Sequence, residues 1–426
     1  MSSLMRSTSF AALLLAVVVA PAQAQVPLSP RAFSLGGALV GGARGHEAIF
    51  INPANLGLLG SPGWSVGLAG LSAGALLEGI SLDEASDFIE YDDLSAEERT
   101  QLLAGIPEDG ARLALNARGP LAALQVGPFG VGLAYVIMGG HSVSRDIIEL
   151  LLEGYEEGRT DYSTADTRGD RVSFTDIALA YGTATGSVSW GVTGHILRGG
   201  TLERTWMTDP RIDLAEQDIA LDYYGLRAEG GTGFALDFGM AYQPHHSVTL
   251  GATVASAYSH LGWSDDIRLR QLALNRADFD ESAGFEDLFD RYDASERELT
   301  DADQDLVGGS PARFLEANAQ LPTTLTLGAA WEPTGSTVLV GSYSDNITDG
   351  TLAGRWDRRI GVGVEQGFWL LAARLGASSD LDGQQLLTGG VRLGVLDLGI
   401  GRLTGEADGM DRDGWFATLG LTTNTR

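Results

Sequence analysis

The chain has 426 residues, with 28 lysines and arginines against 56 aspartates and glutamates, and its formal net charge is −28. All 28 basic residues are arginine. Because the acids outnumber them, no basic footprint remains for nucleic acid, and we expect no nucleic-acid partner. The absence of cysteine excludes disulfides, thiolate metal sites and a lipoprotein anchor. A mean hydropathy of +0.03 is far too low for a bundle of transmembrane helices.

Residues 1–24 have the order of a secretory signal peptide. Arg6 precedes an apolar stretch at 10–20, and Ala22-Gln23-Ala24 supplies the small residues of a cleavage site. A membrane anchor is the alternative, but the apolar stretch is about half of the ~20 residues that a spanning helix needs. We therefore expect cleavage before Gln25 and export to a Gram-negative type of cell envelope.

Side chains in the body of the chain alternate with a period of two, which is the period of a β-strand. One set of alternate positions is large and apolar, and the other is small or polar. Examples of the large set are Phe234, Leu236, Phe238, Met240 and Tyr242, and the residues between them are Ala235, Asp237, Gly239 and Ala241. A soluble sandwich would show bulky residues inside and charges outside, so this pattern indicates strands with one face in lipid.

About 14 such strands are predicted, which is an even number, as in single-chain bacterial barrels. Each approximates the ~9–11 residues needed to cross a bilayer as a tilted strand. They lie near 62–72, 118–126, 129–140, 171–184, 187–199, 230–243, 247–258, 321–332, 336–343, 355–365, 368–377, 384–394, 396–403 and 413–422.

Short and long connections alternate between these strands. Short turns fall at Gly127-Pro128, 184–186, 244–246, 333–335, Gln366-Gly367 and near Val395-Leu396, and the principal long acidic connections span 73–117, 141–170, 200–227 and 259–319. Tight periplasmic turns and long external loops are typical of outer-membrane barrels. The fold class predicted is therefore all-β, a transmembrane antiparallel up-and-down barrel over residues 61–426.

Tryptophans are expected to form two girdles at the membrane interfaces. By the predicted strand ends, Trp64, Trp190, Trp331 and Trp369 lie on the periplasmic side, and Trp263, Trp356 and Trp415 lie on the external side.

A glycine-rich segment precedes the first strand. Glycine this dense does not suit an ordinary edge strand, but it suits a chain wound inside a lumen, and Asn52-Pro53 predicts a turn. We expect residues 25–60 to form an N-terminal hatch inside the barrel. The motif residues are Gly36, Gly37, Ala38, Asn52, Pro53, Ala54 and Leu56.

With the strand count, this motif resembles the FadL-type family of outer-membrane transporters, whose glycine-rich stretch ends in Asn-Pro-Ala-x-Leu. Asn55 stands where glycine is commoner in that family. The resemblance implies a hatch that plugs the lumen and a hydrophobic ligand that leaves sideways or through a rearranged hatch. The segment is also similar to the related PorV-like barrels, which implies docking of a protein partner as the alternative function.

No constellation of catalytic or metal-binding residues emerges from the sequence. The six histidines are dispersed or adjacent in a predicted turn, so no metal spacing is present. There is also no nucleophile elbow and no phosphate-binding loop. We therefore expect neither catalysis nor a cofactor.

Two arginines are predicted to face each other in the lumen. If Gln366-Gly367 forms a two-residue turn, Arg359 and Arg374 lie directly opposite on neighbouring strands. Opposed like charges are destabilising, so an anion is expected beside them. One interpretation is an internal acid, namely Glu47 of the hatch, Asp237 or Asp357. The other is the carboxylate of an amphiphilic ligand, or a latch in which that ligand competes with Glu47.

The sequence thus predicts an outer-membrane barrel that passively admits small hydrophobic, fatty-acid-like molecules. Ligand capture is expected to use apolar loop residues such as Phe285, Leu288 and Phe289. The expected partners are outer-membrane lipid, a hydrophobic small molecule and, in the PorV-like alternative, a protein at the external loops. A cavity reaching the hatch would favour transport, whereas a filled lumen would favour docking. An open porin is a third alternative, against which the hatch motif argues.

Overall fold

A computed structural model describes residues 29–81, 95–153, 159, 161–208, 211–213, 218–263, 266–275, 291–292, 294–316, 321–348, 358–381, 383–407 and 410–423. The predicted signal peptide and the capture residues Phe285, Leu288 and Phe289 lie outside this part of the chain. Within it, no helix is both long and apolar enough to cross a membrane.

Fourteen antiparallel strands form a closed barrel. The last strand pairs with the first, so the sheet closes on itself. This arrangement confirms the predicted fold class. The barrel strands are β1 (Trp64–Glu78), β2 (Ala111–Val126), β3 (Phe129–Val143), β4 (Arg168–Thr185), β5 (Val188–Met207), β8 (Thr232–His245), β9 (Val248–Gly262), β12 (Thr324–Thr334), β13 (Thr337–Asn346), β14 (Arg358–Phe368), β15 (Leu371–Ser379), β16 (Gln385–Leu393), β17 (Leu396–Ala407) and β18 (Met410–Thr423).

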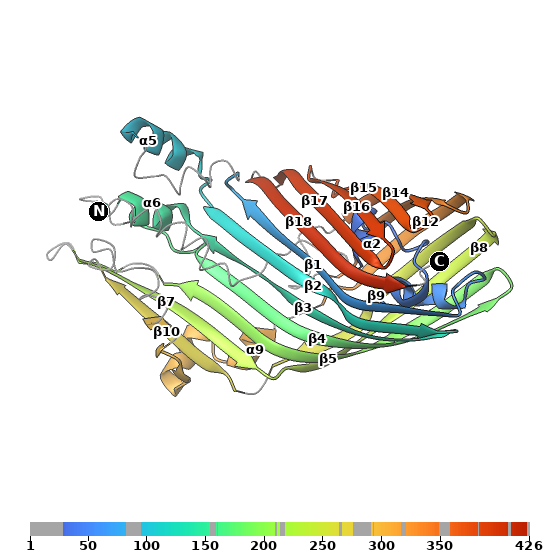
Figure 1. Ribbon diagram of the computed structural model, residues 1–426. Coiled ribbons are helices and arrows are strands. Elements are labelled where there is room, and N and C mark those ends of the chain that lie inside the picture. Colours follow the sequence, from blue (N-terminus) through green and yellow to red (C-terminus); the bar gives the residue numbers. More distant parts are fainter. Residues whose placement is uncertain are drawn as a thin grey trace.

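One side of the barrel rises well beyond the other (Figure 1). There, β7 (Asp218–Glu229) pairs with the end of β5 and with β10 (Arg268–Asn275), and two short strands, β6 (Arg211–Asp213) and β11 (Arg297–Glu298), join them. The helices α5 (Ala96–Gly105) and α6 (Arg145–Glu153) lie at this end. α9 (Pro311–Glu316) packs against β5, β7 and β9, and it also contacts η5 (Asp301–Val307).

These extensions correct the predicted loops at 73–117, 141–170, 200–227 and 259–319, because strand residues occupy parts of all four ranges. The prediction relied on large apolar residues facing lipid. In β7 the alternation is instead between buried apolar and charged residues, for example Leu226 and Ala228 against Arg227 and Glu229. A strand that extends past the membrane has no lipid-facing side, so it lacks the pattern that was sought.

The bulky side chains of the barrel point outward. Phe238, Trp190 and Leu375 are 51%, 53% and 66% exposed, whereas the inward Thr193 and Ala235 are 0% and 3% exposed. Exposed large apolar residues on every barrel face, with small or polar residues inside, are what a lipid-embedded barrel requires.

Tryptophan placement follows the prediction with one exception. Trp64, Trp190, Trp331 and Trp415 are about half exposed near strand ends. Trp263 is fully buried and packs over Gly199 and Gly231, so its assignment to a girdle is wrong. The two glycines leave room for the indole under the extended sheet. Trp356 lies outside the described residues.

The bore contains residues 29–58, which are called the N-terminal segment below. It comprises α2 (Pro30–Ser34), η2 (Gly45–Glu47), α3 (Ala48–Ile51) and η3 (Pro53–Gly57). α2 packs against β15 to β18, and η3 packs against β4, β5 and β8. Small inward residues make this possible, since a Cβ added at Gly191 would lie 2.5 Å from the backbone nitrogen of Ala54.

Lipid contact on the outer face is tested by replacing Phe238 with arginine. A water-exposed position tolerates this change within about 0.5 kcal/mol. At a lipid-facing position we expect the free energy of unfolding in phosphatidylcholine vesicles to fall by about 2–4 kcal/mol. Phe238→Leu is the control. A change for Phe238→Arg no larger than that of the control would contradict a lipid-facing surface.

Candidate ligand cavity and the N-terminal segment

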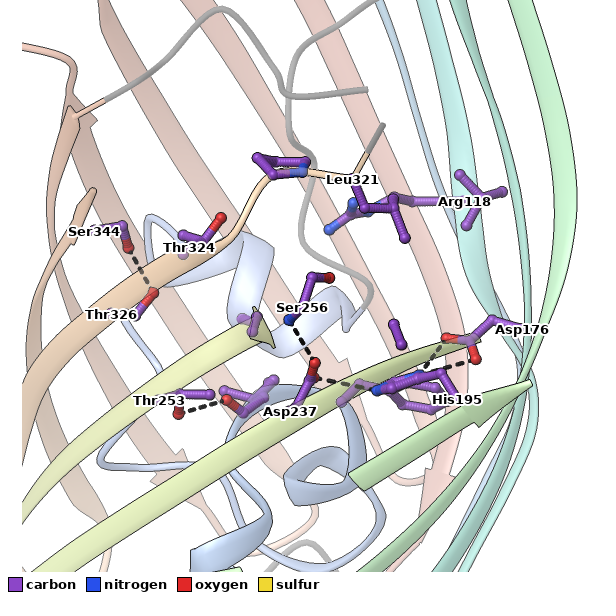
Figure 2. A pocket seen from close by; sticks show the side chains of 18 of the residues that line it. Arg118, Asp176, His195, Asp237, Thr253, Ser256, Leu321, Thr324, Thr326 and Ser344 are labelled. Atoms are coloured by element: carbon purple, nitrogen blue, oxygen red, sulfur yellow. Dashed lines mark hydrogen bonds and ion pairs between the residues drawn. The ribbon is translucent and has the colours of Figure 1, made fainter. Parts of the chain in front are cut away.

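A cavity of about 290 Å³ lies in the lumen directly above the N-terminal segment (Figure 2). Its floor consists of Ala32, Gly37, Val40, Phe50 and Ile51, and its walls come from nine strands between β2 and β14. The volume is near the lower end of ligand pockets, which run from about 300 to 1,000 Å³. The space therefore suits a small molecule.

Part of the wall is apolar. Val136 and Met138 on β3, Phe174 on β4 and Leu197 on β5 line one side, and Leu321, which precedes β12, closes over the opposite side. An apolar wall with a few polar groups is the usual composition of a small-molecule site.

Three polar residues of the wall, one imidazole and two carboxylates, form one cluster. His195 of β5 places Nδ1 2.9 Å from Asp176 of β4 and Nε2 3.2 Å from Asp237 of β8. Asp237 also accepts a 2.8 Å hydrogen bond from the backbone nitrogen of Ser256. Figure 2 shows the three side chains in a row along the wall. Both ring nitrogens of His195 therefore face carboxylates.

Two arginines project into the same cavity, Arg118 from β2 and Arg359 from β14. Both side chains carry a positive charge and line the same space, where like charges repel. Nε of Arg118 is buried and has no hydrogen-bond partner among the residues that the structure describes. Arg359 lies over Gly37, where a Cβ would be 2.8 Å from its terminal nitrogen.

The described residues that line the cavity include three groups that can carry positive charge, Arg118, Arg359 and His195, and two carboxylates, Asp176 and Asp237. Arginine side chains in such a site suit an anionic group on a ligand, because hydrogen bonds between charged partners are stronger than neutral ones.

A separate, fully buried chain of charges joins the N-terminal segment to the wall. Glu47 accepts from Arg31 at 3.1 Å, Arg31 donates to Glu365 at 2.7 Å, and Glu365 accepts from Arg374 at 2.7 Å. Arg374 also pairs with Asp397. All five side chains are at most 4% exposed.

Arg31 is the link between segment and barrel. Burial acts to lower its pKa, but attraction to Glu365 and Glu47 outweighs burial, and the pKa is raised above its ordinary value. The guanidinium therefore stays charged at any pH at which the protein is folded.

The predicted opposition of Arg359 and Arg374 is wrong. Arg374 faces Glu365, and Arg359 faces Ser344 on the other neighbouring strand. The β14–β15 turn is formed by Trp369 and Leu370, three residues beyond the predicted Gln366-Gly367, because the strands continue pairing to Phe368 and Leu371.

The three residues of the predicted latch therefore occupy two places. Glu47 and Arg374 belong to the buried charge chain, with Arg31 and Glu365 between them, while Arg359 lines the cavity. Of the suggested internal acids, Asp237 pairs with His195, and Asp357 lies outside the described residues.

The first half of the glycine-rich motif packs tightly on β14 and β15. Gly36 and Gly37 have positive φ angles of 65° and 74°. A Cβ at Gly36 would lie 2.6 Å from the carbonyl oxygen of Ala377, so glycine is required for both conformation and space. Ala38 is fully buried beside them.

The second half of the motif fixes the turn that begins η3. Asn52 caps the helix by accepting from the nitrogen of Ala54 at 3.1 Å, and its amide donates to the carbonyls of Val40 and Met240 at 3.3 and 3.2 Å. Pro53 starts the helix, a favoured position for proline. Ala54 and Leu56 are buried at 0% and 3% exposure.

Several residues of these sites were not predicted as site residues. Arg31 and Glu365 carry the charge chain, and Arg118, Asp176 and His195 line the cavity. The alternation pattern already placed His195 and Asp237 on the inward face. Their proximity depends on the pairing of β5 with β8, which are separated by about 25 residues that include β7. Among the described residues, no group of three or more side chains is suited to hold a metal ion.

Comparison with known proteins gives structural relatives only. No family model and no curated protein sequence matches the chain. The Ralstonia pickettii toluene transporter TbuX aligns with a TM-score of 0.52 and 14% identity, over 94% of this chain and 99% of that chain. The monoaromatic hydrocarbon channel CymD gives 0.54 and 10%, over 94% and 98%.

A third relative, the Pseudomonas putida toluene transporter TodX, gives a TM-score of 0.52 and 11% identity, over 95% of this chain and 98% of that chain. At such low identity the likeness concerns the fold. The chain therefore has the fold of a FadL-type outer-membrane barrel, as the sequence resemblance predicted.

The buried charge chain makes a measurable prediction. Glu365→Gln removes one charged partner from Arg31 and one from Arg374. Breaking a buried ion pair costs about 3–5 kcal/mol. With a reporter cysteine at the buried Ala43, we expect maleimide labelling of the folded barrel to accelerate at least about 100-fold, the equivalent of about 3 kcal/mol.

Glu406→Gln, at an exposed position on β17, is the matched control and should leave labelling unchanged. Equal labelling rates in the two variants would show that the charge chain does not hold the N-terminal segment.

Proposed function

We propose that this protein is an outer-membrane channel for passive uptake of small hydrophobic molecules. The observation that carries the proposal is the cavity, which has one apolar side, lies inside a lipid-facing barrel and is floored by the N-terminal segment. The three structural relatives named above are described as toluene or monoaromatic hydrocarbon channels, which supports the same class of cargo. A barrel that serves only as a docking structure would not need this cavity.

The cargo that fits best is a hydrophobic molecule with one carboxylate, as in a short fatty acid. Arg118 and Arg359 offer charged donors to the anionic group, and Val136, Met138 and Phe174 offer apolar surface to the rest. Charged hydrogen bonds of this kind are roughly twice as strong as neutral ones. In this proposal Arg359 keeps the ligand-binding role, Arg118 replaces Arg374 as its companion, and Arg374 and Glu47 belong to the latch.

The route out of the cavity is proposed to be sideways through the wall. Displacing the N-terminal segment would break the Arg31–Glu365 pair and several buried hydrogen bonds, including those of Arg44, Asn52 and Thr193. Each such loss costs about 1–3 kcal/mol or more. Displacing the N-terminal segment to open a route is therefore costly in free energy.

The wall is interrupted between β1 and β2. Their ladder stops at the pair Leu68 and Ala122 and resumes at Ser72 and Arg118. Ala69 has a φ of 49°, and proline at 120 cannot donate to a ladder.

The interruption lies between the cavity and the lipid-facing surface. Arg118 lines the cavity on the inner side, and Leu71 lines an apolar groove on the outer side. Parting the two strands at this point breaks few hydrogen bonds, so we expect the ligand to leave here.

Ligand charge is tested by comparing octanoate with octanol, which have chains of equal length. We expect wild-type protein in detergent to bind octanoate about 10- to 100-fold more tightly, the equivalent of a charged hydrogen bond. Arg118→Gln and Arg359→Gln should weaken octanoate binding by a similar factor and leave octanol binding unchanged, as measured by isothermal titration calorimetry.

Arg198→Gln, which removes an exposed arginine outside the cavity, is the control. The anionic cargo is excluded if both ligands bind equally or if both variants weaken octanol as much as octanoate. Octanol binding alone would still support uptake of neutral hydrophobic molecules.

The route is tested with pairs of cysteines, since the native chain has none. A Cβ at Gly42 lies 3.5 Å from that of Ala330, which suits a disulfide, so Gly42→Cys with Ala330→Cys tethers the N-terminal segment to β12. Leu68→Cys with Ala122→Cys, bridged by dibromobimane, tethers β1 to β2. We expect octanoate uptake into proteoliposomes to survive the first tether and to be lost with the second.

Reduction of the disulfide and the unbridged Leu68→Cys with Ala122→Cys protein are the controls. The opposite pattern, loss of uptake with the segment tethered and survival with the strands bridged, would mean that ligand leaves past a displaced N-terminal segment.

A further inference from the structure

Three of the two-residue turns at the end of the barrel opposite α5 and α6 begin with a glycine in the same backbone conformation. The first turn residue is Gly127 between β2 and β3, Gly186 between β4 and β5, and Gly394 between β16 and β17, and each has a positive φ between 56° and 64°. Between β14 and β15 this position is Trp369, with a φ of 51°. A bulky side chain is strained in this conformation.

Trp369 is also 95% exposed. It does not lie alone, because the β14–β15 and β16–β17 turns are joined by a 2.8 Å hydrogen bond from the nitrogen of Gly394 to the carbonyl of Leu370. Leu370 and Val395, the second residues of these turns, are 53% and 52% exposed. We call these two turns, with Trp369, Leu370 and Val395 at their tips, the apolar turn pair.

Three other turns at this end have polar tips. Ser187 follows Gly186 in the β4–β5 turn, the β8–β9 turn carries His246 and Ser247, and the β12–β13 turn carries Gly335 and Ser336, whereas the β2–β3 turn carries Gly127 and Pro128. Polar tips suit water, so the apolar turn pair differs from these three turns in composition, and Trp369 differs from the glycine-led turns in backbone strain.

The strands that carry the apolar turn pair are short. β15 and β16 have 9 residues each, against 15 to 20 in β1, β3, β4 and β5. Nine residues, at a rise of ~3.3 Å and a tilt of ~45°, reach about 21 Å across a bilayer. The apolar band of an outer-membrane barrel is about 25 Å tall. On this wall the strands alone are too short to cover the hydrocarbon.

We propose that the apolar turn pair is inserted into the membrane and completes the lipid-facing belt of the short wall. Its partner is the boundary between headgroups and acyl chains of the leaflet at this end of the barrel. Tryptophan is enriched at this boundary because its ring is apolar and its N–H is polar, and leucine and valine suit the acyl side. Glycine at position 369 would relieve the backbone strain, but it could not supply the aromatic ring.

Lipid fits this surface better than a protein partner for two reasons. The apolar turn pair continues the outward-facing rows of β15 and β16 without a polar residue in between. The row on β15 is Leu371, Ala373 and Leu375, and the row on β16 includes Leu387, Val391 and Leu393. The missing height is also about that of one turn. This inference does not depend on the cavity or its ligand, so failure of the proposed function leaves it unaffected.

The test uses single-cysteine variants at matched second positions of two turns, Leu370→Cys in the apolar turn pair and Ser187→Cys in the β4–β5 turn. Each is labelled with an environment-sensitive fluorophore (NBD) and folded into phosphatidylcholine vesicles, and folding is verified by heat-dependent gel mobility. We expect the label at 370 to be quenched several-fold more by doxyl groups on the acyl chains, and several-fold less by aqueous iodide, than the label at 187.

A second variant isolates the tryptophan. Trp369→Gly, combined with Leu370→Cys, introduces the glycine that the turns at Gly127, Gly186 and Gly394 use, so the turn remains able to fold. We expect iodide quenching of the label at 370 to rise towards that of the label at 187.

Three results would overturn the proposal. Equal iodide quenching at 370 and 187 would place the apolar turn pair in water. Protection from iodide without quenching by doxyl lipid would mean that a second copy covers it. Unchanged quenching in Trp369→Gly would mean that the ring does not anchor the turn.

Discussion

The structure depends on one constraint, which is that every backbone N–H and C=O inside a membrane must find a partner within the protein. A sheet satisfies this only when its first and last strands pair, as β1 and β18 do. Closure then divides the side chains of each strand into an outer set that contacts lipid and an inner set that contacts the bore. Large residues such as Phe238 belong outside and small ones such as Gly191 inside, which leaves a bore wide enough for a second layer of chain.

The N-terminal segment uses that space, and its attachment explains the distribution of buried charge. Removing backbone from water without partners is costly, so the segment bonds to the inner wall through Asn52, Thr193 and Thr253. The alternating acids and arginines from Glu47 to Asp397 add a second attachment. Above this packed layer the bore opens into a cavity, where Arg118 has no acidic partner among the described residues. Acids and arginines thus alternate in pairs where the N-terminal segment is attached, and Arg118 lines the cavity where a ligand is proposed to bind.

Much of the barrel could be predicted from the sequence, because the membrane imposes a pattern with a period of two that one strand displays by itself. The segment 232–245 reads as a strand without its neighbours. The pairing register between neighbouring strands cannot be predicted from the pattern of a single strand. The glycine at 367 predicts a turn at Gln366-Gly367. In the structure the two strands pair three residues further, up to a turn that begins with Trp369. Arg374 therefore faces Glu365 instead of Arg359. Likewise, the unit of Asp176, His195 and Asp237 depends on β5 pairing with β8, a contact between distant segments. The extended strands beyond the membrane were missed because no lipid face marks them.

The same reasoning explains where the barrel departs from regularity. Within the described residues, five non-glycine residues have positive φ, and three of them, Ala69, Trp369 and Ser256, lie at places with a proposed role. Ala69 lies at the interruption of the wall, Trp369 at the apolar turn pair, and Ser256 donates its backbone nitrogen to Asp237 in the cavity. Such conformations persist only where the surrounding structure compels them, and they cluster at functional positions. A uniform cylinder of paired strands would be stable and closed. Exit for a ligand, a polar wall in the cavity and a short side fitted to the bilayer each require a local exception to that uniformity.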